Sequence, residues 1–198
     1  QMKKQNILSG NTLVATIMSN VGLKKLCELN DISFKETKVG DRYVLEEMLK
    51  NNYSIGGEQS GHVIFKQYST TGDGQLTAIK FIEVMLNTGK KSSKLNNLVK
   101  KYPQKSATIT IDNNQKGLIS KNLELSNYIH SIQNDISTSG KVVVRESGTE
   151  PKIRIMVEHE DTKKLDELLD LKNTLSTLES PDKEIIILRY FNDYTQDE

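Results

Sequence analysis

One segment combines residue types that could bind a sugar, residues 56–62 (GGEQSGH). Its glycines let the backbone adopt conformations closed to other residues and approach a ligand closely. Glu58 and Ser60 are two residues apart, so a carboxylate and a hydroxyl can hydrogen-bond adjacent sugar hydroxyls. His62 adds a group that titrates near neutral pH. A plain polar turn, with a solvated glutamate and a locally bonded histidine, also fits because short glycine-rich turns are common.

A second segment, residues 145–154 (RESGTEPKIR), has the composition of a phosphate-binding turn. The hydroxyls of Ser147 and Thr149, with the amides around Gly148, form a small nest of hydrogen-bond donors. Arg145 and Arg154 lie at the two ends, on strands that can pair as a hairpin, and a guanidinium matches phosphate oxygens well. A hairpin loop with two exposed arginines is the alternative. The segment is neither a Walker loop nor a dinucleotide fingerprint.

Other polar residues have structural explanations. Residues 70–74 (TTGDG) open a predicted helix, so helix capping explains them. His130 and His159 lack partners at metal-ligand spacing, and Cys27 falls in an apolar helical pattern typical of a core residue. The sequence therefore predicts no metal site, and the residues alone favour a sugar- or phosphate-binding α/β protein.

Alternating strand and helix signals position the first turn. We expect strands over residues 12–18, 32–39, 53–55 and 63–65, and helices over residues 21–29, 41–51 and 73–86. Residues 12–18 are β-branched and apolar on both faces, as in a strand buried in a parallel sheet. The last helix is amphipathic, with Leu76, Ile79, Ile82 and Met85 or Leu86 forming its apolar stripe. This order predicts an α/β layered unit with helices on both faces of the sheet.

A different architecture follows. Residues 88–103 are polar and lysine-rich, which predicts a short helix and then an interdomain linker. Beyond them the sequence predicts a strand, a helix and two strands, over residues 106–112, 123–136, 141–145 and 152–157. This is a small α+β unit. From residue 161 onward every signal is helical, and Pro181 suits the first position of a last helix.

Composition and charge exclude several classes of protein. The 198 residues include one cysteine, which excludes a disulfide framework and a cysteine zinc site. No apolar run approaches the roughly 18 residues of a membrane span, and the start lacks a signal peptide's apolar core, so we expect a cytoplasmic protein. Residues 1–104 carry 15 basic and 9 acidic side chains, and residues 105–198 carry 12 and 17. This distribution favours an anionic ligand and argues against DNA.

The two turns, in this order, resemble those of a known enzyme family. The matching stretches lie between residues 11 and 158: NTLVATIMSNVGL, KVGDRYVLEEM, SIGGEQSGHVIF, YSTTGDGQLTAIKFIEVM and RESGTEPKIRIMVE. They resemble the C-terminal half, the third and fourth domains, of the bacterial phosphoglucosamine mutases in the α-D-phosphohexomutase family. The resemblance implies a three-layer α/β/α third domain over residues 1–88, a linker helix over 89–104, a small α+β fourth domain over 105–160 and a helical tail over 161–198.

The resemblance also implies an activity and a set of site residues. The family interconverts glucosamine 6-phosphate and glucosamine 1-phosphate by intramolecular phosphotransfer, on the route to peptidoglycan precursors. By motif position, the substrate-binding residues would be Asp41, Arg42, Glu58, Ser60 and His62, with His62 an accessory catalytic residue beside the transferred group. The residues that hold the non-reacting phosphate would be Arg145, Ser147, Gly148, Thr149 and Arg154.

Two family loops are missing from this sequence. The phosphoserine loop and the aspartate-rich Mg²⁺ loop belong to the family's first two domains, and neither motif occurs here. Phosphoryl transfer needs a phosphorylated nucleophile and a cation. We therefore expect a truncated enzyme that is inactive alone, binds no metal or cofactor, and takes a separate chain for the first two domains. Glu146 also replaces the proline usual in the phosphate loop, and its charge would repel a phosphate unless it points outward.

The tail has a resemblance of its own. Residues 171–198 resemble the start of the promoter-reading C-terminal domain of RNA polymerase sigma factors, but carry 3 basic and 6 acidic residues and so would bind DNA poorly. An ordinary amphipathic helix pair is the alternative. For the whole chain, the alternatives are a non-catalytic binding or regulatory fusion and a gene remnant. Within the family, the alternative is a phosphomannomutase or phosphoglucomutase, although VGDRYV and GEQSGH favour glucosamine.

Overall fold

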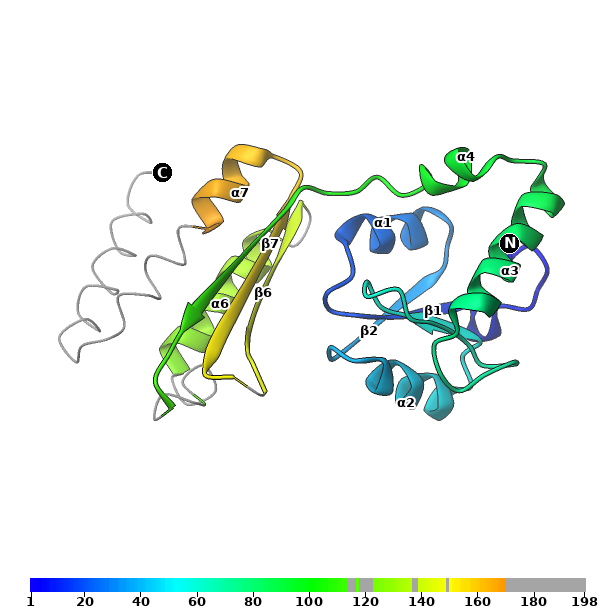
Figure 1. Cartoon of the computed structure of the whole chain (residues 1–198). Helices are drawn as coiled ribbons and strands as arrows, with labels where there is room; N and C mark the ends of the chain where they lie inside the picture. The colour runs from blue at the N-terminus through cyan, green and yellow to red at the C-terminus, as the bar shows by residue number, and fades with distance from the viewer. Residues whose placement is uncertain (114–116, 118–122, 137–138, 149, 170–198) are drawn as a thin grey trace. The chain divides into compact units, whose positions relative to one another are not determined.

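The structure, a computed structural model, describes residues 1–113, 117, 123–136, 139–148 and 150–169 (Figure 1). The chain divides into two compact units, residues 1–101 and residues 102–198, each of which is described by itself. Thr149 and the predicted helices beyond residue 169 lie outside the described residues.

The first unit contains a mixed four-stranded sheet. Its strands are, in sheet order, β2 (Ser33–Thr37), β1 (Thr12–Thr16), β3 (Ile55–Gly57) and β4 (Val63–Phe65). The central strand β1 is parallel to both β2 and β3, while β4 returns antiparallel to β3 as a hairpin. The predicted parallel arrangement of the first strands is therefore confirmed, and the hairpin carries the glycine-rich turn.

Two helices flank this sheet on opposite faces, α1 (Val21–Leu29) and α2 (Asp41–Asn51) (Figure 1). The Asn20 side chain caps α1 by accepting a hydrogen bond from the Gly22 amide at 3.0 Å, and Cys27 is buried as predicted. Val44 and Met48 of α2 pack against Val14 and Ile64, and this cluster forms the core of the unit. The α/β layered architecture predicted from the sequence is confirmed.

The remaining helices of the unit are α3 (Gly74–Thr88) and the short α4 (Ser92–Asn96). Asp73 caps α3 by accepting a hydrogen bond from the Leu76 amide at 2.9 Å, as helix capping predicts. The apolar stripe of α3 is nevertheless not buried: Ile79, Ile82 and Leu86 are exposed among the residues that the structure describes. Periodicity indicates which residues share a helix face, but burial needs a partner for that face.

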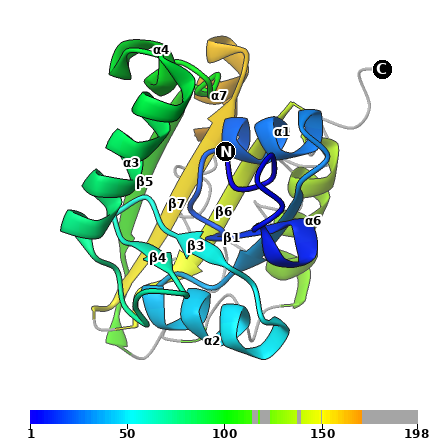
Figure 2. The ribbon, with the colours of Figure 1, turned by 90° about the vertical axis from the view of Figure 1, so that its right-hand side faces the viewer.

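The second unit is a three-stranded antiparallel sheet with packed helices. Its strands are, in sheet order, β5 (Gln104–Thr110), β7 (Lys152–His159) and β6 (Gly140–Glu146). Helix α6 (Leu123–Asp135) packs against β6 (Figure 2), and α7 (Thr162–Leu169) follows β7. Ile129, Ile132, Ile155 and Leu165 belong to one core cluster. This is the predicted small α+β unit.

Candidate functional site

The turn between β3 and β4 is closed by backbone contacts that require glycine. The Glu58 amide donates a hydrogen bond to the His62 carbonyl at 2.9 Å. A Cβ on Gly57 would lie 2.6 Å from that same carbonyl oxygen, and Gly61 has a left-handed φ of +97°. Both positions therefore exclude a side chain, and this backbone holds residues 58 and 62 next to each other.

Three polar side chains converge above this turn. The Ser60 hydroxyl donates to Glu58 Oε1 at 2.7 Å and lies 3.1 Å from His62 Nδ1, which is 3.3 Å from the same carboxylate oxygen. The Glu58 side chain is only 12 % exposed, whereas that of His62 is 53 % exposed. The predicted grouping of these residues is a feature of the structure, with the carboxylate inside and the imidazole facing solvent.

The pKa of Glu58 lies below its ordinary value, mainly because Ser60 donates a hydrogen bond to the ionised carboxylate. Partial burial opposes this shift, while His62 and a hydrogen bond from the Gly40 backbone reinforce it. The carboxylate is therefore held ionised as a hydrogen-bond acceptor. The sequence does not indicate this role of Gly40, because the contact joins residues that are 18 positions apart.

A second glycine positions the imidazole. A Cβ built on Gly72 would lie 2.9 Å from His62 Cβ and 3.0 Å from His62 Cδ2. The Asp73 amide also donates to the Val63 carbonyl at 3.3 Å, which ties the start of α3 to β4. Helix capping explained TTGDG at the level of sequence, but Gly72 also provides space for His62. The sequence signal for this role is that Gly72 directly precedes Asp73, the residue that caps α3.

Asp41 and Arg42 begin α2, directly after Gly40. Asp41 accepts a hydrogen bond from the Arg42 amide at 2.8 Å, and Arg42 Nε donates to Glu46 Oε1 at 2.7 Å. This pairing raises the pKa of the exposed Arg42 guanidinium. The structure thus brings the start of α2 to Glu58 through Gly40, while the Arg42 side chain is engaged along the helix surface.

The second predicted turn joins β6 and β7 and brings the two arginines together. Arg145 and Arg154 are directly opposed in the antiparallel register, so their side chains leave the same face of the sheet. Their pairing across a hairpin, predicted from the sequence, is confirmed. Two like charges at opposed positions repel each other unless an anion lies nearby.

Glu150 supplies one such anion. Its carboxylate accepts from Lys152 Nζ at 2.7 Å and from Arg154 Nη2 at 3.3 Å. The pKa of Glu150 is lowered, first by the Lys152 hydrogen bond and then by the charges of Lys152 and Arg154. Arg145 is less satisfied: its Nε atom is buried and hydrogen-bonds to no group that the structure describes.

Glu146 projects away from Arg145, because successive strand residues alternate between the two faces of a sheet. Its carboxylate accepts a hydrogen bond from the Gly117 amide at 2.8 Å. Glu146, which stands where the family usually has proline, therefore points away from Arg145, and this direction reduces the repulsion that its charge would exert on a phosphate.

The remaining residues of the turn are Ser147 and Gly148. The Ser147 amide donates to the Lys152 carbonyl at 2.8 Å, and its hydroxyl accepts from the Glu150 amide at 3.4 Å. Gly148 is exposed, and a Cβ there would meet nothing within 4 Å. In this turn the Ser147 hydroxyl is hydrogen-bonded and Gly148 has free space around its Cα. Thr149 lies outside the described residues.

Comparisons with known proteins bear on the family. A family model described as phosphoglucomutase/phosphomannomutase, alpha/beta/alpha domain III, matches residues 1–102. The model of the C-terminal domain of the same family matches residues 110–171. The chain belongs to the phosphoglucomutase/phosphomannomutase family. What it contains are the third and the C-terminal domains, in that order.

Similar proteins within this phosphohexomutase family include a phosphoglucosamine mutase. The chain is 46 % identical over 168 residues to the phosphoglucosamine mutase of Clostridium botulinum (strain Kyoto / Type A2), over 85 % of this chain and 37 % of that protein. The chain therefore spans little more than a third of the length of this curated relative.

Solved structures show the same fold. An N-acetylphosphoglucosamine mutase of Aspergillus fumigatus matches with a TM-score of 0.69 at 15 % identity, over 84 % of this chain and 38 % of that one. The same fungal enzyme in complex with GlcNAc-6P and magnesium matches with a TM-score of 0.61 at 15 % identity, over 84 % and 39 %. At this identity the likeness concerns the fold alone.

The family's magnesium ion has no matching ligand set in the described part of this chain. No group of three or more His, Cys, Asp or Glu side chains placed to hold a metal ion occurs among the described residues. No helix in the described part of the chain is both long and apolar enough to cross a membrane.

Proposed function

We propose that this chain provides the sugar-binding and phosphate-binding parts of a phosphoglucosamine mutase, which interconverts glucosamine 6-phosphate and glucosamine 1-phosphate. The observation that carries the proposal is the cluster of Glu58, Ser60 and His62 in a chain 46 % identical to a phosphoglucosamine mutase over 168 residues. An ionised, largely buried carboxylate beside a hydroxyl suits the adjacent hydroxyls of a hexose.

In the proposed complex, Glu58 accepts hydrogen bonds from sugar hydroxyls and Ser60 contacts the same edge of the sugar. His62 is exposed and lies next to the group being transferred, where it orients a phosphoryl oxygen. Asp41 and Arg42 line the same part of the site, next to the Gly40 amide that contacts Glu58. Such contacts contribute by positioning, which dominates catalysis of phosphoryl transfer.

The β6–β7 turn holds the phosphate that does not react, through Arg145, Ser147, Gly148, Thr149 and Arg154. Support comes from the opposed register of the two arginines and from the buried Arg145 Nε, whose donor capacity is unused among the described groups. A bound phosphate would satisfy both guanidiniums and replace Glu150 on Arg154. Binding energy at this fixed end then promotes transfer at the other end of the sugar.

We further propose that the 198-residue chain catalyses no transfer by itself. Its sequence contains neither the family's phosphoserine loop nor its aspartate-rich loop. The family's first two domains would supply the nucleophile and the cation for that transfer.

The test is a calorimetric titration of the chain with glucosamine 6-phosphate, and with glucose 6-phosphate for comparison. We expect saturable binding with a Kd of about 1 mM or lower, tighter for the amino sugar. Arg145→Ala should weaken binding at least about tenfold, because a charge-assisted hydrogen bond contributes about 1.5–3 kcal/mol. Lys164→Ala, which removes an exposed cation from α7, should leave it unchanged. Absence of binding by a folded chain, or equal loss in both variants, would contradict the proposal.

A further inference from the structure

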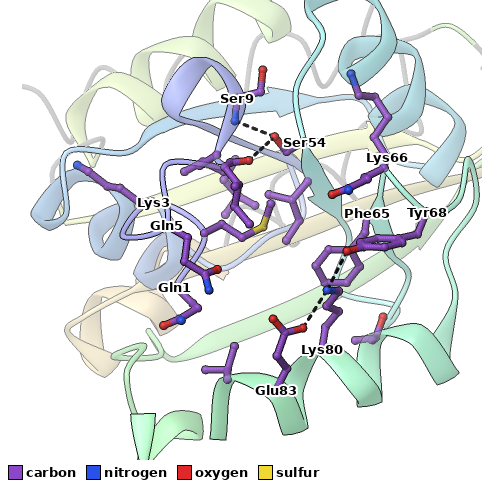
Figure 3. Close-up of a pocket in the computed structure, with 18 of the residues that line it drawn as sticks. Gln1, Lys3, Gln5, Ser9, Ser54, Phe65, Lys66, Tyr68, Lys80 and Glu83 are labelled. Atoms are coloured by element: carbon purple, nitrogen blue, oxygen red, sulfur yellow. Dashed lines mark hydrogen bonds and ion pairs between the residues drawn. The ribbon is translucent and has the colours of Figure 1, made fainter. Parts of the chain in front are cut away.

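The lysine in the wall of the cavity beside α3 keeps its hydrogen bonds over a wide range of pH. Lys80 donates to Glu83 Oε2 at 2.9 Å and to the Tyr68 hydroxyl at 3.1 Å, beside a cavity of about 510 Å³ (Figure 3). These two bonds, that to Glu83 first, raise the pKa of Lys80. A histidine behaves differently near neutral pH, because a gained proton turns a ring nitrogen from an acceptor into a donor.

His159 is a buried histidine at the end of β7 in the second unit. It is 4 % exposed and lies opposite Gly140 of β6 in the antiparallel register. A Cβ on Gly140 would lie 2.9 Å from His159 Cδ2. The imidazole therefore packs directly against the backbone of β6, away from solvent.

The two ring nitrogens of His159 have different partners. Nδ1 accepts a hydrogen bond from the Asp161 amide at 2.9 Å, and Nε2 lies 3.0 Å from Ser139 Oγ. Because an amide only donates, Nδ1 carries no proton and the proton of the neutral ring lies on Nε2. The Ser139 hydroxyl donates to the Ile136 carbonyl at 3.5 Å, which leaves its oxygen free to accept from Nε2. The neutral ring thus joins the residues before β6 to those before α7.

Asp161 also forms the start of α7. Its Oδ1 accepts from the Lys163 amide at 2.8 Å, and its carbonyl accepts from the Leu165 amide at 3.1 Å. His159 Nδ1 lies 3.2 Å from this same carbonyl oxygen. A proton on Nδ1 would be repelled by the Asp161 N–H and attracted by the carbonyl that Leu165 uses. Leu165 is 2 % exposed and belongs to the core cluster of the unit.

We propose that His159 is a pH-sensitive switch at the start of α7. In its neutral form the ring holds the Asp161 amide. In its protonated form it releases that amide and competes with the Leu165 amide for the Asp161 carbonyl. The neutral form is the one that the native hydrogen bonds use, so its contribution is present at neutral pH and is lost as histidine gains a proton, between about pH 8 and pH 5. The second unit is then less firmly packed in mild acid.

Other charged groups lie on the elements around His159. They are Glu160, Asp161, Lys163, Lys164 and Asp166 at the start of α7, Lys105 on β5, Lys141 on β6, Glu158 on β7 and Asp135 on α6. Lys105 forms an ion pair with Asp166. Glu158 and Lys141 lie on the opposite face of the sheet from His159, because successive strand residues alternate. Carboxylates and lysines ordinarily keep their charge between pH 5 and 8, so the switch belongs to the imidazole.

The test is hydrogen exchange of the 198-residue chain, followed by NMR at about pH 7.5 and about pH 5.5 and expressed as protection factors. We expect the protection of the Leu165 amide to fall about two- to tenfold at the lower pH, the range expected for loss of one hydrogen bond. His159→Asn keeps an acceptor oxygen close to the position of Nδ1 but does not titrate, so its protection should be the same at both pH values. His130→Asn, at an exposed histidine of α6, should behave like the wild type.

The ¹⁵N NMR spectrum of the wild-type imidazole gives a second measurement, which does not depend on the folding of any variant. At about pH 7.5 we expect the proton on Nε2. A proton on Nδ1 at that pH overturns the proposal, as does protection in the wild type that does not change with pH, or an equal fall in His159→Asn. Neither measurement requires a bound sugar phosphate, so this proposal and the proposed function can fail separately.

Discussion

The lowered pKa of the Glu58 carboxyl depends mainly on the neighbouring Ser60 hydroxyl. Ser60→Ala removes the hydrogen bond that contributes most to lowering the pKa of Glu58, so this pKa should rise towards its ordinary value. Because the folded pKa is the lower one, the carboxylate stabilises the native state above its unfolded pKa. That contribution disappears as the pH falls through the folded pKa, and in Ser60→Ala it should disappear at a higher pH.

The measurement is a carboxyl ¹³C NMR titration of the wild-type and variant chains. Glu150 is an internal reference, because its lowered pKa is caused by Lys152 and Arg154 and should not respond to residue 60. An unchanged Glu58 titration in Ser60→Ala would show that another group holds this carboxylate ionised.

Gly72 controls the space beside His62. Gly72→Ala should displace the imidazole, because the added Cβ would lie 2.9 Å from His62 Cβ. We expect shifted His62 ring resonances in NMR spectra. Gly74→Ala is the control, since a Cβ there meets nothing within 4 Å. Equal shifts in both variants would mean that the loop moves as a whole and that Gly72 has no particular role.

A substitution at Gly148 should affect phosphate binding without affecting the stability of the fold. Its φ is not left-handed and a Cβ would have free space, so Gly148→Ala should leave the melting temperature unchanged. If backbone amides around Gly148 hold a phosphate, the added methyl group should block that approach. Loss of one charge-assisted hydrogen bond, about 1.5–3 kcal/mol, corresponds to tenfold or weaker binding in the calorimetric titration. A variant that binds normally would remove this turn from the phosphate site.

The residues of both turns could be identified from sequence because carboxylates, hydroxyls and arginines between short strands are visible by type and spacing. The contacts of Gly40 with Glu58 and of Gly72 with His62 could not, because they join distant parts of the chain. The pairing of Arg42 with Glu46 is visible as an i, i+4 spacing, but only coordinates show that the guanidinium adopts it.

At the scale of elements, the fit of α2 against the sheet depends on the absence of a side chain at residue 56. Gly56→Ala forces a methyl group against Val44, Met48 and the Val14 carbonyl. Overpacking of this kind typically costs about 1–3 kcal/mol, which urea denaturation should detect. Gly74→Ala, in the same unit, should be close to neutral. A Gly56→Ala variant as stable as wild type would mean that α2 moves away at little cost.

The boundaries of helices and strands were predicted correctly where the local sequence signals were strong. The predicted helix over 41–51 and strand over 63–65 coincide with α2 and β4. Strand β3 begins at Ile55 rather than at residue 53, because hairpin pairing with β4 sets its length. The burial of the apolar stripe of α3 could not be predicted, since hydrophobic periodicity does not indicate whether another element covers that face of the helix.

At the scale of the molecule, each unit has a core of its own, one around Met48 and one around Ile155. Met48→Ala should destabilise the first unit by about 2–5 kcal/mol, and Ile155→Ala the second. Hydrogen exchange followed by mass spectrometry should show faster exchange only in residues 1–101 for Met48→Ala. Faster exchange in both units would mean that they unfold together.

The Glu150 carboxylate affects how an anion could bind to the turn between β6 and β7. Because Glu150 forms an ion pair with Arg154, four residues along the chain, a phosphate bound as proposed would compete with this carboxylate for the guanidinium. In the proposed complex, phosphate would replace the Glu150 carboxylate on Arg154, so the binding free energy would be the difference between these two interactions. Glu150→Gln removes this competing charge and should therefore tighten the binding of phosphate esters in the calorimetric titration; unchanged binding would mean that Glu150 does not compete.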